Sequence, residues 1–141
     1  MMYVLDTNVI SELRPGKPHQ SPAVMSWAGA MPASQFFLSA ITLLEQEIGI
    51  QRLERRMPPE GGALRAWFDA LVKSFAGRIL SFDAAAALRC APLHVPDTKS
   101  YRDSMIAATA LEHGFTLVTR NVADFREVPG IKLINPWEHG T

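Results

Sequence analysis

The sequence predicts an α/β fold in which helices flank a parallel sheet. Short apolar segments of strand length recur along the chain, three of them apolar enough to be buried on both faces, and stretches with helical spacing separate them. Strands that alternate with helices favour parallel pairing, and right-handed crossovers bring their C-terminal ends to one edge of the sheet. Open sheets of this kind bind ligands at that edge.

Local patterns predict the elements in order. Apolar residues three or four positions apart predict helices, and Gly77 is typical of a helix end. Prolines and glycines predict a turn between two helices at residues 58–62 and a loop at residues 92–96. The predicted strands are residues 3–5, 36–38, 79–82, 116–119 and 131–134, and the predicted helices begin near Val9 and include residues 41–48, 64–75 and 101–113.

Length, cysteine content and charge limit the function classes. The 141 residues are expected to form one domain, residues 1–141, with a core large enough to need no disulfide. Its single cysteine, Cys90, favours a reducing, cytoplasmic setting, and no export signal or transmembrane segment is expected. Equal numbers of acidic and basic residues argue against a protein that holds nucleic acid mainly by bulk electrostatic attraction.

Four acidic residues occupy positions where this sheet would gather ligands. Asp6 ends the first predicted strand, Glu45 lies just inside the helix after the second, and Asp124 follows the fourth by a few residues. Asp103 opens the last predicted helix and joins the other three if that helix packs beside the same edge of the sheet.

Each acid also has a purely structural explanation. Asp6 and Asp124 are residue types that cap helices. Glu45 and Asp103 each stand three residues after a Thr or Ser, which is the pattern of a capping box, and the first of these begins at Thr42. Taken singly, the acids are better explained as caps, so it is their common position that favours a functional site.

The chemistry of four gathered carboxylates predicts a metal site. Like charges at one edge repel unless a cation neutralises them. Carboxylate oxygens without Cys or His are ligands that Mg²⁺ or Mn²⁺ prefers, and such a site supports hydrolysis of phosphate esters by an activated water molecule. We therefore expect Asp6, Glu45, Asp103 and Asp124 to be both the catalytic and the metal-binding residues.

Five stretches form an ordered set of motifs around these acids. They are residues 4–12 (VLDTNVISE), 38–45 (LSAITLLE), 103–110 (DSMIAATA), 117–125 (LVTRNVADF) and 135–137 (NPW). In this order and spacing they resemble the PIN-domain ribonucleases of the VapC type, and within them the FitB-like branch. The resemblance extends over the whole chain and is loosest in the helical hairpin at residues 58–77.

The resemblance implies a three-layer α/β/α sandwich with a central parallel sheet, and an endoribonuclease that depends on Mg²⁺ or Mn²⁺. Asp6 and Asp103 would be metal ligands, and Glu45 a ligand or a base that acts through water. The protein would be the toxin of a type II toxin–antitoxin module that cleaves a structured RNA such as tRNA or rRNA. It would form a homodimer, be inhibited by a VapB- or FitA-type antitoxin, and reach operator DNA only through that antitoxin.

One position departs from the family pattern. Many FitB-like proteins carry an aspartate directly after the Thr-Arg pair, where this chain has Asn121, and here the acid comes three residues later as Asp124. The fourth position of the site is therefore open between Asp124 and Asn121.

Polar residues beside the acids are expected to support them. Thr7, Asn8 and Thr119 would orient a carboxylate or hold a water bound to the metal, although Asn8 is equally well explained as a turn residue. Arg102 and Arg120 flank two of the acids, and each either clamps a phosphate group of the substrate or forms a local salt bridge.

Two other functions remain open on the sequence alone. In one, the chain is an aspartyl phosphatase with Asp6 as nucleophile, although such enzymes usually have a second acid where this chain has Asn8. In the other, the acids cap helices and the chain is a non-catalytic module that binds RNA or protein. The large apolar residues are expected in the core or in an interface, and exposure of Trp67 would indicate an antitoxin or a second protomer.

Overall fold

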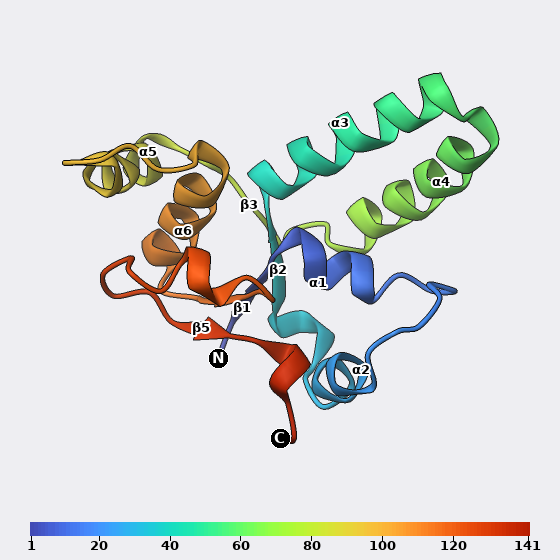
Figure 1. The fold of residues 1–141 in the computed structure, drawn as a ribbon, viewed down its shortest axis with the longest axis horizontal. Coiled ribbons are helices and arrows are strands. Elements are labelled where there is room, and N and C mark those ends of the chain that lie inside the picture. Colours follow the sequence, from blue (N-terminus) through green and yellow to red (C-terminus); the bar gives the residue numbers. More distant parts are fainter.

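The computed structural model describes residues 1–141 and contains a five-stranded parallel sheet with the strand order β3-β2-β1-β4-β5 (Figure 1). In the centre, β1 pairs with β2 on one side and with β4 on the other, so that Tyr3 lies opposite both Phe36 and Thr116. The strands are β1 (Tyr3–Leu5), β2 (Phe36–Ser39), β3 (Ile79–Leu80), β4 (Thr116–Val118) and β5 (Leu133–Ile134). The five predicted strands are thus confirmed, several of them with shorter ends.

Six α-helices and four short 3-10 helices connect or follow the strands. The helix predicted over residues 101–113 is confirmed, and it ends at Gly114, whose φ of 68° is a left-handed conformation that favours glycine. None of the helices is both long and apolar enough to cross a membrane. The α-helices are α1 (Thr7–Glu12), α2 (Pro22–Gly29), α3 (Ala40–Arg56), α4 (Pro58–Ser74), α5 (Ala84–Cys90) and α6 (Tyr101–His113), and the 3-10 helices are η1 (Ala33–Gln35), η2 (Ala91–His94), η3 (Val122–Asp124) and η4 (Pro136–Glu138).

The sheet separates two apolar clusters and so forms the middle of three layers. Alternate residues of a strand point to opposite faces. Tyr3 and Leu5 of β1 therefore pack on one face with α1 and with the buried Trp27 of α2, whereas Val4 packs on the other face with Ile106 of α6. This arrangement confirms the α/β/α sandwich.

The turn predicted at residues 58–62 is wrong. These residues form the beginning of α4, and a single residue, Met57, separates α4 from α3. Pro58 suits the first turn of a helix because a backbone N–H in that turn has no hydrogen-bond acceptor within the helix, so nothing is lost when proline lacks it. Figure 1 shows α3 and α4 as a hairpin that projects from the sheet. The loop predicted at residues 92–96 is also partly wrong, since its first half belongs to η2.

Candidate active site

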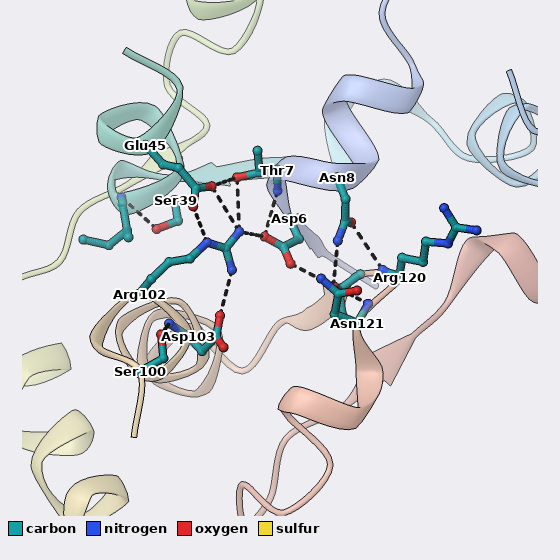
Figure 2. Close-up of polar contacts among 12 residues, drawn as sticks. Asp6, Thr7, Asn8, Ser39, Glu45, Ser100, Arg102, Asp103, Arg120 and Asn121 are labelled. Carbon is teal, nitrogen blue, oxygen red and sulfur yellow. Dashed lines mark hydrogen bonds and ion pairs between the residues drawn. The ribbon is translucent and has the colours of Figure 1, made fainter. Parts of the chain in front are cut away.

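The structure brings three of the four predicted acids together at the C-terminal edge of the sheet (Figure 2). Asp6 follows β1 directly, Glu45 lies in the second turn of α3 after β2, and Asp103 lies in the first turn of α6. Each of the three carboxylates accepts a hydrogen bond from the same guanidinium group, that of Arg102.

Asp6 is fully buried, and both of its carboxylate oxygens have partners. Its Oδ1 accepts the backbone N–H of Thr7 at 2.7 Å and Nη2 of Arg102 at 2.5 Å. Its Oδ2 accepts the hydroxyl of Thr119 at 2.7 Å. The predicted capping role is real, because Asp6 is the N-cap of α1, and the same side chain also faces the other acids.

Glu45 is half-buried and is held by two donors. The hydroxyl of Thr7 donates to its Oε1, and Arg102 donates to both of its oxygens. Burial acts to raise the pKa of Glu45, but the hydrogen bonds from Arg102 and Thr7 outweigh it, so that the pKa lies below its ordinary value. The carboxylate is therefore charged at neutral pH.

The capping box proposed for Glu45 is wrong. The helix α3 begins at Ala40, and its N-cap is Ser39, whose hydroxyl accepts the N–H of Ile41 at 3.0 Å. Thr42 therefore lies inside the helix, where its hydroxyl is buried without a hydrogen-bond partner. The side chain of Glu45 is free to turn toward the sheet edge.

Only half of the second capping box forms. The Ser100 hydroxyl accepts the N–H of Asp103 at 3.4 Å, as an N-cap should. The carboxylate of Asp103 turns instead toward Arg102, whose Nη1 donates to its Oδ1 at 2.8 Å.

Arg102 is the residue whose place the sequence did not predict. Its guanidinium lies between Glu45, Asp6 and Asp103, as Figure 2 shows, and its side chain is 31% exposed. Desolvation acts to lower the pKa of Arg102, but the three carboxylates raise it above its ordinary value. The one signal in the sequence is that Arg102 precedes an acid of the cluster, which suggested a local salt bridge or a phosphate clamp rather than contacts with all three acids.

The fourth acid lies apart from the other three. Asp124 is exposed at the end of η3 and does not contact Arg102. It shares with Asp103 a cavity of about 220 Å³, which Lys99 and Ser100 also line. Asp124 does not begin η3, so the structure contradicts a capping role there.

The remaining predicted residues form a polar layer behind Asp6. The hydroxyl of Thr119 accepts hydrogen bonds from the side chain of Asn8 at 3.4 Å and from the backbone N–H of Asn121 at 3.1 Å. Asn8 in turn accepts the backbone N–H of Arg120 at 3.3 Å. The guanidinium of Arg120 does not reach the acids and lies over the ring of Trp137, 5.0 Å from its centroid.

The oxygen atoms of this site suit a hard divalent cation in their chemistry but not in their present spacing. The side-chain atoms that could bind a metal ion here are carboxylate or hydroxyl oxygens, which Mg²⁺ and Mn²⁺ prefer. As the side chains stand, no three Asp, Glu, His or Cys residues come close enough together to hold one metal ion. Arg102 lies between the acids and pairs with all three.

Comparison with known proteins agrees with this geometry. The sequence pattern of the PIN domain matches residues 3–131. The chain is 39% identical to the VapC ribonuclease Y4jK of Sinorhizobium fredii, over 97% of this chain and 99% of the relative. It is 33% identical to the toxin FitB of Neisseria gonorrhoeae, over 96% and 99%.

A solved structure extends the agreement to three dimensions. The structure of FitAB bound to an IR36 DNA fragment contains a chain that superposes with a TM-score of 0.82 at 32% identity, over 99% of this chain and all of the other. The similarity of sequence and fold extends over nearly the whole length of the chain, and the acids lie at the expected edge of the sheet. The chain belongs to the PIN-domain family, in its VapC and FitB branch.

Proposed function

We propose that this protein is a metal-dependent endoribonuclease and the toxin of a type II toxin–antitoxin module. The observation that carries the proposal is the convergence of Asp6, Glu45 and Asp103 at the sheet edge. The name of the 39% identical relative, a VapC ribonuclease, supports RNA as the substrate. A cluster of this kind suits hydrolysis of a phosphodiester, because a metal ion held by carboxylates can activate the attacking water and stabilise the departing oxygen.

The residues have distinct roles in this proposal. Asp6 and Asp103 would hold Mg²⁺ or Mn²⁺, and Glu45 would hold the ion or accept a proton from the attacking water. When bound, the ion lowers the pKa of a water molecule and neutralises charge on the departing oxygen. Thr7 and Thr119 orient the carboxylates through the hydrogen bonds described above.

The fourth position is assigned to Asp124 rather than Asn121. Asp124 lines the same cavity as Asp103, so an ion or a nucleotide in that cavity would contact both. Asn121 uses its backbone N–H to support Thr119 instead. We expect loss of the Asp124 carboxylate to slow cleavage by about 10-fold, less than loss of an acid of the central cluster.

The substrate is proposed to be a folded RNA such as tRNA or rRNA. The chain has no net charge, so selectivity has to come from shape and a few contacts rather than from a basic surface. We expect Arg120, whose backbone N–H donates to Asn8, to contact a phosphate group of the bound RNA through its guanidinium.

An antitoxin is the proposed inhibitor. The relative FitB is named a toxin, and the solved structure with the similar chain is a FitAB complex on DNA. An apolar groove of about 460 Å³ lies between α1 and α4 and offers a docking surface lined by Ile10, Leu13, Trp67 and Leu71. Trp67 is only partly buried there, which is the exposure expected of a residue that meets a partner.

A second copy of the chain is the other proposed partner. Leu44 and Ile48 of α3 are 57% and 42% exposed, although both are large and apolar. Together with Met105 of α6 they line a hollow beside Glu45 and Arg102. In a symmetric homodimer, the same patch on the second copy would cover this one and bury both from solvent.

The test is cleavage of total RNA by protein freed of antitoxin, in Mg²⁺, in Mn²⁺ and in EDTA, with mapping of the product ends. We expect cuts at a few sites that need the metal, and a loss of at least about 100-fold in Asp6→Asn and Asp103→Asn. Asp97→Asn, which alters an exposed acid outside the site, is the matched control. Cleavage by the two variants at the wild-type rate would overturn the assignment, and a phosphorylated Asp6 would favour the phosphatase alternative.

A further inference from the structure

The guanidinium of Arg102 occupies the centre of the acid cluster. Its Nη2 lies 2.5 Å from Oδ1 of Asp6, its Nη1 lies 2.8 Å from Oδ1 of Asp103, and Nε and Nη2 both donate to Glu45. One side chain thus pairs with acids that follow β1, lie in α3 and open α6.

This contact is more than a surface ion pair. The side chain of Asp6 is completely buried, and a buried charge without a counter-charge is strongly destabilising. Arg102 supplies that counter-charge, while its own side chain remains 31% exposed. Arg102 thus contacts all three acids and still remains open to solvent.

The hydrogen bonds of Asp6 show which donor a metal ion has to displace. Oδ1 already accepts two donors, the backbone N–H of Thr7 and Arg102, and Oδ2 accepts the buried hydroxyl of Thr119. The Thr7 N–H is fixed by the start of α1, and Thr119 is fully buried between neighbouring strands. Among these donors only Arg102 belongs to a long, partly exposed side chain, so Arg102 is the donor that can make room.

We propose that Arg102 is the resident cation of the metal-free site and that it exchanges with the divalent ion. The inference rests on the proposed metal-dependent function. Mg²⁺ binds carboxylate oxygens at about 2.0–2.1 Å, and a guanidinium on the same oxygens both repels a divalent ion and occupies its position. The apparent affinity for the metal ion is then lowered by the free energy needed to displace Arg102 from the acids.

Metal affinity tests the exchange without reference to activity. Isothermal titration of metal-free protein with Mn²⁺ is compared for the wild type and for Arg102→Gln, with Arg52→Gln as control. Arg52 is exposed and lines the same hollow as Arg102, so its loss changes the nearby charge equally without touching the acids. We expect Arg102→Gln to bind Mn²⁺ about 10-fold more tightly than the wild type, and Arg52→Gln to change the affinity by less than about 2-fold.

The outcomes separate this inference from the function on which it rests. If the wild type binds Mn²⁺ and Arg102→Gln binds it equally or more weakly, Arg102 supports the metal site and the exchange is wrong, while the metal-dependent function stands. If neither protein binds Mn²⁺, the metal site itself fails, and the exchange fails with it. Binding by Arg102→Gln alone supports the exchange in its strongest form.

A second variant and a second measurement cover the case in which Arg102→Gln does not fold. Arg102→Lys keeps one charge but replaces the planar guanidinium, whose three nitrogens reach different carboxylates, by a compact ammonium, so its Mn²⁺ affinity should lie between those of the wild type and the Gln variant. In the wild type, the Nε–H signal of Arg102 in an NMR spectrum should be protected from water without metal and lose that protection in Mg²⁺. A signal that stays protected in saturating Mg²⁺ would overturn the exchange.

Discussion

The carboxylate of Asp6 caps a helix and belongs to the acid cluster at the same time. Its two oxygens accept different hydrogen bonds. Oδ1 accepts the N–H of Thr7 at the start of α1, and Oδ2 accepts the hydroxyl of Thr119. A fully buried carboxylate is stable only when hydrogen bonds and a counter-charge replace its water. Capping and function, which the sequence presents as rival explanations, are therefore compatible at this residue.

Glu12 is a second buried acid, and it is purely structural. Its carboxylate accepts the backbone N–H of Ser21 at 2.6 Å and pairs with Lys17 at 3.1 Å, which ties the end of α1 to the start of α2. The hydrogen bond from Ser21 lowers the pKa of Glu12 and, with Lys17, outweighs the opposite effect of burial. Glu12→Gln should lower the free energy of unfolding at pH 7 by roughly 1–3 kcal/mol, which urea denaturation measures.

The pH dependence of that difference follows from the direction of the shift. A carboxyl group whose pKa is lowered on folding stabilises the protein above its unfolded pKa, near 4.5, and loses this effect as the pH falls through the folded value. The gap between wild type and Glu12→Gln should therefore be full at pH 7 and shrink below pH 4.5. Exposed Glu127 is the control, because Glu127→Gln should change little at either pH. A gap that grows on acidification would contradict this account.

Close packing rather than charge holds the α3–α4 hairpin. Arg65 of α4 donates to Glu47 at 2.6 and 2.8 Å and to Glu54 at 2.9 Å, and its hydrogen bonds lower the pKa of Glu47 to about 2. Solvent screens such a cluster, so exposed pairs contribute little. By contrast, Gly61 of α4 lies directly against the backbone of Glu54 in α3.

Gly61→Ala is therefore predicted to open the hairpin. A Cβ at this position would lie 2.5 Å from Cα of Glu54 and 2.6 Å from its backbone nitrogen, and backbone atoms cannot move aside as a flexible side chain can. We expect a loss of roughly 1–3 kcal/mol in the free energy of unfolding. Gly62→Ala is the matched control, because a Cβ there meets nothing within 4 Å and should stabilise the helix by up to about 1 kcal/mol. Equal stability of the two variants would rule out this packing.

This contact also explains why the sequence misplaced the beginning of α4. Prolines end helices and begin them, so Pro58 and the glycines after it predict a turn equally well. The contact between Gly61 and Glu54 of the neighbouring helix, which local sequence does not report, favours the helix. The strands and α6 are predictable because runs of apolar residues and end signals such as Gly114 act locally.

The parallel topology of the sheet makes most of the candidate site predictable. Asp6, Glu45 and Asp103 converge because the strand ends and the start of α6 meet at one edge of the sheet. The position of Arg102 is not predictable in this way, because its ion pair with Asp6 joins residues 96 positions apart through a side-chain conformation. The topology of the sheet determines where the backbone of each residue lies. The position of the guanidinium between the acids depends instead on the conformation of one long side chain.

The exposed apolar patch of Leu44 and Ile48 on α3 is where two copies of the chain would meet. If a second copy covers Leu44 and Ile48, a charge in that patch should split the dimer, because an unpaired carboxylate in an apolar interface loses its water without compensation. Leu44→Asp should sediment as a monomer at micromolar concentrations at which the wild type sediments as a dimer. Leu88→Asp is the control, since Leu88 of α5 is 77% exposed and lies outside the patch, so that variant should remain dimeric. A monomeric wild type, or a dimeric Leu44→Asp, would show that this face of α3 is not where two copies meet.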